Sequence, residues 1–273
     1  MNCFMPSDFE YADDDLETME KLLLRRGFLV ERRGEGAVQG LFLSDNSFRP
    51  ANLHERKDLG PRAEDDAAFL ERLGEPLRLK ISRDDEAMMR ITWQGAVDSR
   101  FADRLFSPLE FQRESERPYQ DSRVRFCNEE YLRGYKYPLS MLDTGTAALV
   151  KAFSSVGANT WESCDGHGRQ NAIITFCGPF YARGAGAALR IALKGEDSRI
   201  GWSFSGERLD MRSADGSHGS EYYSAIYDAA VRLYAGRERL LSLKRQLMSD
   251  ISAEHDDESA LRRIDELAAQ PGA

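Results

Sequence analysis

Reactive side chains are concentrated in one short stretch, residues 163–169, which reads Ser-Cys-Asp-Gly-His-Gly-Arg and is called the Cys-His loop below. It combines a thiol, a carboxylate, an imidazole and a guanidinium, and its two glycines allow the backbone to turn sharply. No other part of the sequence groups such side chains as densely. We therefore take this loop as the candidate site.

Metal binding is the first chemistry open to the loop. Cys164 and His167 offer the thiolate and the imidazole that zinc prefers as ligands. A zinc site needs about two more ligands from elsewhere in the chain. The candidates are Asp165, Cys127, Cys177 and His218.

Two further chemistries use the same residues. In nucleophilic or redox catalysis, His167 activates the thiol of Cys164, and Asp165 completes the catalytic set. In ligand binding without covalent chemistry, backbone amides and donor side chains of the loop hold a phosphate or carboxylate. The residues assigned to that role are Ser163, Gly166, Gly168 and Arg169.

A structural role is the alternative to all three chemistries. A cysteine at a strand end is often a small buried hydrophobic residue, and Asp-Gly sequences suit tight turns. The density of reactive groups favours a function over a mere turn. The sequence leaves open whether the protein is an enzyme or a non-enzymatic module, either a zinc-stabilised binding domain or a regulatory partner of another protein.

Regular elements are predicted on both sides of the loop. The apolar spacing of residues 138–156 predicts a helix, and residues 159–164 and 172–177 predict the strands that enter and leave the loop. A helix over 179–193 and an antiparallel strand pair over 200–211 follow. Residues 220–269 are helical in pattern, and their leucines at 240–251 suit a dimer seam or a partner protein.

The run Ser163-Cys164-Asp165-Gly166-His167-Gly168 resembles the S-C-x-G-H-G loop of small bacterial and phage α/β proteins. More distantly it is similar to the S-C-S-G-R motif of the wybutosine-synthesis tRNA methyltransferase family, in which an arginine stands at the position of His167. The similarity covers residues 138–205. It implies a nucleotide, RNA or S-adenosylmethionine-linked role for the loop. Arg169 would then replace the family's arginine.

The N-terminal part has a different pattern. Residues 16–26 predict a helix ended by Gly27, and short alternating segments up to Trp93 predict antiparallel strands around a second helix at 64–73. Residues 99–123 lack a period and predict a linker. We expect an antiparallel α+β module over 1–120, of unknown role, followed by a small α/β sandwich with a long C-terminal helix over 121–273.

Composition limits the classes of function. The 273 residues are 41% hydrophobic and 30% charged, and no apolar run approaches the length of a membrane span, so we expect no membrane insertion and a cytoplasmic location. The four cysteines form no CxxC pair. The net charge of −9 disfavours nonspecific duplex binding by the whole surface. The tyrosine-rich segment 128–137 remains a candidate for stacking on a single strand of RNA.

Overall fold

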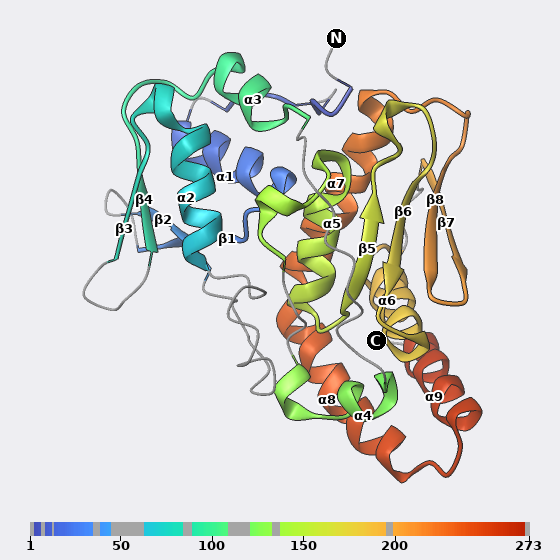
Figure 1. Cartoon of the computed structure of the whole chain (residues 1–273). Helices are drawn as coiled ribbons and strands as arrows, with labels where there is room; N and C mark the ends of the chain where they lie inside the picture. Colours follow the sequence, from blue (N-terminus) through green and yellow to red (C-terminus); the bar gives the residue numbers. More distant parts are fainter. Residues whose placement is uncertain are drawn as a thin grey trace.

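The computed structural model is an α+β protein with two antiparallel sheets of four strands each among its described residues. It confirms the expected fold class (Figure 1). The described residues are 3–6, 9–12, 14–34, 39–44, 63–83, 89–108, 121–132, 137–194 and 199–270.

The first sheet has the strand order β1-β2-β4-β3 and is contacted by the helices α1 and α2. Its strands have four residues each and pair antiparallel. Strand β3 begins three residues later than the alternation from Leu77 suggests, since Glu75–Leu77 forms a 3₁₀ turn instead. The elements are α1 (Asp15–Arg26), β1 (Val30–Arg33), β2 (Gly40–Leu43), α2 (Ala63–Leu73), β3 (Lys80–Arg83), β4 (Met89–Thr92) and α3 (Ser99–Leu105).

Helix α1 ends where the sequence predicts. Its first turn is capped by Asp14, whose side chain accepts a hydrogen bond from the backbone of Leu16. At the other end Gly27 adopts φ 101°, a left-handed conformation that favours glycine. A Cβ at Gly27 would also lie 2.9 Å from the backbone of Ala148, so this turn lets α1 approach α5 closely.

The prediction of an irregular linker over 99–123 was wrong at both ends of that segment. Residues 99–105 form α3, because the Asp98 carboxylate accepts from two backbone amides of its first turn and Phe101 and Leu105 are buried. Residues 122–126 form α4 (Ser122–Phe126), which Asp121 caps in the same way. Apolar residues show no regular spacing in the sequence here because both helices are short. Residues 109–120 lie outside the described part.

The second sheet has the order β5-β6-β8-β7 and carries the Cys-His loop between its first two strands. Cys164 is the last residue of β5 and faces Ile173 of β6 across the antiparallel ladder. The expected strand pair over 200–211 is β7 and β8, joined by a tight turn. The elements are β5 (Thr160–Cys164), β6 (Ala172–Phe176), α6 (Pro179–Ala192), β7 (Ile200–Ser205) and β8 (Arg208–Ser213).

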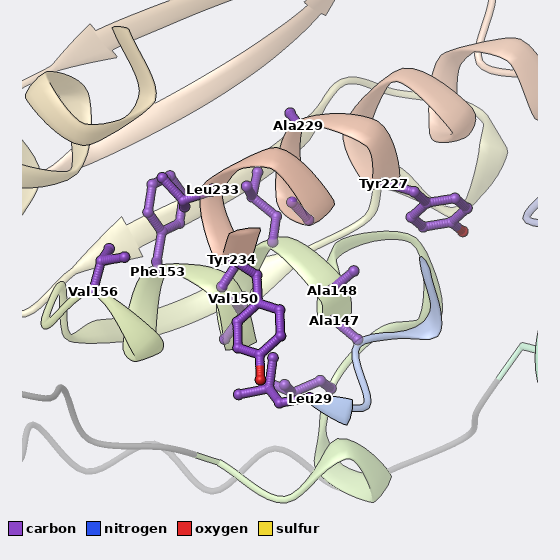
Figure 2. Close-up of a cluster of buried hydrophobic side chains, with 14 of the residues drawn as sticks. Leu29, Ala147, Ala148, Val150, Phe153, Val156, Tyr227, Ala229, Leu233 and Tyr234 are labelled. Carbon is purple, nitrogen blue, oxygen red and sulfur yellow. The ribbon is translucent and has the colours of Figure 1, made fainter. Parts of the chain in front are cut away.

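Helix α5 (Thr144–Ser155) runs beside β5 and is buried along its whole length. It packs against α7 (Ser220–Ala235), and Figure 2 shows Phe153 and Leu233 among the side chains that fill the contact. The helix begins at residue 144, not at 138, because a 3₁₀ turn (Leu139–Met141) and an extended residue precede it. Its N-terminus therefore lies next to the end of β5.

The C-terminal helical region is divided into three helices. Gly236 separates α7 from α8 (Arg237–Ala253), and an extended residue after α8 precedes α9 (Asp257–Ala269). Leucines of the α8 seam, including Leu240 and Leu247, are buried inside the chain. Across the described ranges, we find no helix with both the length and the apolarity that a membrane crossing requires.

One continuous apolar core extends through both sheets, from Phe4 to Leu267. Helix α1 contributes to it by contacting both α5 and α7. Asp66 of α2 is buried in an ion pair with Lys151 of α5, which adds a polar link between the two halves. The division into modules at residue 120 stays a prediction.

Candidate functional site

The structure brings Cys164 and His167 together. Strand β5 delivers Cys164 to the start of the Cys-His loop, and the 3₁₀ turn η6 (Gly166–Gly168) then reverses the chain. His167 adopts φ 53° and ψ 34°, the left-handed conformation that residues other than glycine rarely adopt. This backbone turns the imidazole toward the strand end, so that Nε2 lies 3.7 Å from Cys164 Sγ.

A third side chain joins them from another element. Asp143 precedes the first residue of α5 and is 5% exposed, and its carboxylate, Cys164 Sγ and one ring nitrogen of His167 lie within 4.8 Å of one another. Asp143 occupies the N-cap position of α5, yet its side chain does not cap the helix. It instead accepts a hydrogen bond from the backbone amide of Asp165 at 3.3 Å.

The sequence does not single out Asp143, because the apolar spacing of residues 138–156 predicts one continuous helix. The signal that would have found it is the order Asp143-Thr144-Gly145, in which an N-cap residue precedes a helix start. Its proximity to Cys164 is a tertiary fact. It follows from the packing of α5 against β5 at the edge of the sheet, which brings together two residues that are 21 positions apart in the chain.

Asp165 performs the capping that Asp143 does not. Its Oδ2 accepts from the amide of Gly145 at 3.1 Å, in the first turn of α5. Its Oδ1 accepts from the amide of His167 at 2.9 Å and lies 3.3 Å from His167 Nδ1. Asp165 is buried, whereas the imidazole is 70% exposed. The carboxylate therefore fixes the ring so that Nε2, and not Nδ1, faces Cys164.

The charges and distances of the site suit a divalent cation. Two carboxylates and a thiolate would carry three negative charges around one imidazole, and a dication would offset most of that charge. In a tetrahedral zinc site the sulfur and nitrogen ligands are about 3.6 Å apart, given bonds of about 2.3 and 2.1 Å. The observed 3.7 Å between Cys164 Sγ and His167 Nε2 matches this spacing. Asp143, Cys164 and His167 thus offer one oxygen, one sulfur and one nitrogen atom that could hold a metal ion.

The other cysteines expected as ligands lie elsewhere. Cys177 follows β6 and donates its thiol to the carbonyl of Thr160, at the far end of β5, about 13 Å along the strand from Cys164. Cys127 caps α4 beside α8, at the lower end of the molecule in Figure 1. Burial raises its thiol pKa. The structure does not bring either residue to Cys164.

His218 lies in a neighbouring loop but is turned to a different partner. Its Nε2 is 3.0 Å from Asn171 Oδ1, and its ring packs edge-on against Tyr222. The backbone carbonyl of His218 lies near Gly168, so the two loops are adjacent. Among the residues that the structure describes, His218 does not belong to the group formed by Asp143, Cys164 and His167.

The backbone amides of His167, Gly168 and Arg169 are already engaged within the protein. The amide of His167 donates to Asp165, and that of Gly168 donates to Tyr223 Oη at 3.0 Å. An anion bound here would therefore depend on side chains. Arg169 is exposed at the end of the loop, and Ser163 is half-buried one residue before Cys164. Within the tyrosine-rich segment, Tyr131 is buried, and residues 133–136 lie outside the described part.

Comparison of the chain with models of protein families, with curated proteins and with solved structures finds no match.

Proposed function

We propose that this protein is a metal-dependent enzyme in which Asp143, Cys164 and His167 hold a zinc ion, and that it acts on a nucleotide or RNA. The observation that carries the proposal is the convergence of three ligand atoms of three different kinds within 4.8 Å. The substrate class rests on the resemblance of the Cys-His loop to proteins of tRNA modification. Zinc bound by three protein ligands keeps a position open, where it acts as a Lewis acid and activates water.

The surrounding residues have distinct tasks under this proposal. Asp165 orients His167 through Nδ1, as carboxylates commonly do for metal-bound histidines. The exposed imidazole edge marks the open side of the site, from which a substrate would approach. Arg169 follows His167 by two residues and is exposed, and its guanidinium suits a phosphate group. The thiol of Cys164 must stay reduced to bind a metal ion, and all four cysteines are free. A reduced thiol agrees with the cytoplasmic location that we propose.

Metal analysis of the purified protein tests the proposal. We expect about one zinc ion per chain, retained through dialysis and lost in Cys164→Ser, His167→Ala and Asp143→Ala. Cys177→Ser and His218→Ala are matched controls, because they remove the same chemical groups from positions outside the cluster. Zinc content that is equal in the wild type and in Cys164→Ser would exclude this centre.

The substrate class needs a separate test. Zinc-loaded protein is incubated with nucleotides and short RNAs, with and without S-adenosylmethionine, and products are identified by mass spectrometry. We expect a product that the metal-free protein and Asp143→Ala do not form. Arg169→Ala should retain zinc but bind inorganic phosphate or AMP more weakly. Stoichiometric zinc without any product would favour a non-enzymatic, zinc-stabilised binding domain, one of the two non-enzymatic alternatives that the sequence offers.

A cysteine nucleophile is the second candidate, and one observation favours it. His167 links the thiol to a carboxylate: its Nε2 lies 3.7 Å from Cys164 Sγ, and its Nδ1 lies 3.3 Å from Asp165 Oδ1. We prefer the metal because the carboxylate of Asp143 adds a third ligand atom beside Cys164 and His167. If the protein contains no zinc and Cys164 is alkylated by iodoacetamide faster than free cysteine near neutral pH, the nucleophile is the better assignment.

A further inference from the structure

The hydroxyl of Tyr223 holds the Cys-His loop at two points on either side of His167. It donates a hydrogen bond to the carbonyl of Asp165 at 2.6 Å and accepts one from the amide of Gly168 at 3.0 Å. These two backbone groups bracket His167. A single side-chain atom therefore closes the turn that carries the histidine.

Tyr223 is itself fixed in place by its surroundings. Its side chain is fully buried on α7, and its ring lies 4.7 Å from that of Phe4. On the other side the ring packs over Gly145, where a Cβ would approach it to 2.4 Å. Because the ring has no room to move, its hydroxyl provides a rigid anchor for the loop.

The loop needs such an anchor. His167 occupies the left-handed region at φ 53°, which is unfavourable for a residue with a Cβ. A relaxed backbone at this position would swing the imidazole and increase the 3.7 Å separation between Nε2 and Cys164 Sγ. Neighbouring contacts must therefore hold the conformation, as is usual for strained residues at functional sites.

We propose that Tyr223 is a positioning residue of the metal site: its hydroxyl holds His167 in the ligating conformation before the metal arrives. The inference rests on the proposed metal centre, since it concerns how that centre is assembled. It assigns to α7 a role at a distance from the metal. Tyr223 does not touch the ligand atoms and acts only through the loop backbone.

The neighbouring Tyr222 offers a matched control. It is also buried on α7, and its hydroxyl also bridges two backbone groups, donating to the carbonyl of Met211 at 2.6 Å and accepting from the amide of Ala172 at 2.7 Å. That bridge joins β6 to β8 and does not include the loop. Tyr223→Phe and Tyr222→Phe thus remove equivalent hydroxyls from one helix, and we expect them to lower stability to a similar extent.

The two variants should differ in metal binding. Zinc affinity is measured by competition with a chromogenic chelator, and the ligand geometry is measured from the absorption bands of the cobalt-loaded protein. We expect Tyr223→Phe to weaken zinc binding by roughly 10- to 100-fold and to alter the cobalt bands, as loss of supporting hydrogen bonds does at other metal sites. Tyr222→Phe should leave the affinity and the bands close to those of the wild type.

The outcomes separate this inference from the proposed function. If the wild type binds no metal, the proposed metal centre fails. If the wild type binds zinc and both variants bind it equally well, the metal centre stands and the role of Tyr223 is overturned. If Tyr223→Phe does not fold, hydrogen exchange of the metal-free wild type tests whether Tyr223 holds the loop before metal binds. The Gly168 amide should then be protected, and exchange at the rate of an open loop overturns the inference.

Discussion

The aspartate at the N-cap position of α5 does not cap that helix, and a second aspartate from the Cys-His loop does. Asp143 stands at the N-cap of α5 but faces Cys164 and His167, whereas Asp165 comes from the loop and caps the helix. A capping carboxylate and a ligand carboxylate are therefore provided by different residues. This arrangement leaves the oxygen atoms of Asp143 close to the proposed metal.

The dual role of Asp165 predicts a specific cost of substitution. Each carboxylate oxygen of Asp165 accepts a hydrogen bond from one backbone amide, that of Gly145 or that of His167. In Asp165→Asn an NH₂ group replaces one of these oxygens, so one of the two amides loses its acceptor. We expect the free energy of unfolding to fall by about 1–3 kcal/mol in the presence of a chelator. Urea denaturation measures this change. Asp215→Asn is the control, since Asp215 accepts similar bonds in an exposed turn, and an equal loss there would contradict the explanation.

Lys244 on α8 is a buried residue whose shifted pKa predicts a pH dependence of stability. Its ammonium donates to the carbonyls of Gly157 and Tyr131, both at 2.8 Å, and lies 4.8 Å from the Phe126 ring. Burial nevertheless lowers the pKa of Lys244 from 10.5 to about 7. The hydrogen bonds to the carbonyls only partly offset the loss of hydration.

This pKa shift predicts stability that rises with pH. Between pH 7 and 10.5 the unfolded chain holds a proton on Lys244 that the folded chain has lost, so unfolding takes up a proton. The free energy of unfolding should increase by up to about 1.4 kcal/mol per pH unit from this group. Urea denaturation at several pH values in that range, for the wild type and Lys244→Met, isolates the contribution of Lys244. We expect the free energy of unfolding of the wild type, minus that of Lys244→Met, to increase with pH. A decrease of this difference with pH would contradict the assignment.

At the scale of elements, the site depends on how closely α5, α7 and the loop approach one another. All residues of α5 are buried, so its position is determined from every side. Gly145 is the point of closest approach, because a Cβ there would lie 2.4 Å from the Tyr223 ring and 2.8 Å from Asp165 Cβ. A glycine at this position lets the two residues that organise the loop pack against the helix start.

The close approach predicts that Gly145→Ala affects both stability and the site. The added methyl group must displace Tyr223 or Asp165, and overpacking of this kind commonly costs about 1–3 kcal/mol. We expect lower resistance to urea together with weaker zinc binding. Gly219→Ala, at the start of α7, is the control, since nothing lies within 4 Å of a Cβ there. Wild-type zinc affinity in Gly145→Ala would show that the contact does not organise the site.

At the scale of the whole molecule, the two sheets share one apolar core although each is formed by a separate part of the sequence. The core includes residues of α1, α5 and α7, and α1 contacts both of the others. Neither half would keep its apolar surface buried if the other unfolded. We therefore expect the chain to unfold as one cooperative unit, with no independent module ending near residue 120.

The three tryptophans allow this expectation to be measured. Trp93 belongs to the first half, and Trp161 and Trp202 belong to the second. Variants that retain Trp93 alone, or the other two alone, with phenylalanine elsewhere, report on each half by fluorescence during urea unfolding. We expect the same midpoint from both sets of tryptophans. Two separate transitions would support a boundary near residue 120.

The sequence alone determined the local features of this protein. Helix α1 with its Gly27 stop, the strands on either side of the Cys-His loop and the C-terminal helices follow from apolar spacing and chain-reversing residues, which act over a few positions. Cys164 and His167 were found for the same reason, because a turn of four residues brings them together. The short helices at 99–105 and 122–126 have too few turns to show a period.

Only the tertiary structure decided which distant residues meet at the loop. Asp143 joins Cys164 because α5 packs along the sheet edge, whereas Cys177 is carried to the other end of β5 by the antiparallel register. Tyr223 reaches the loop from α7, more than 50 positions away. These meetings depend on how buried faces pack, and no short-range pattern encodes them, since the same spacing of apolar residues suits many arrangements of helices on a sheet.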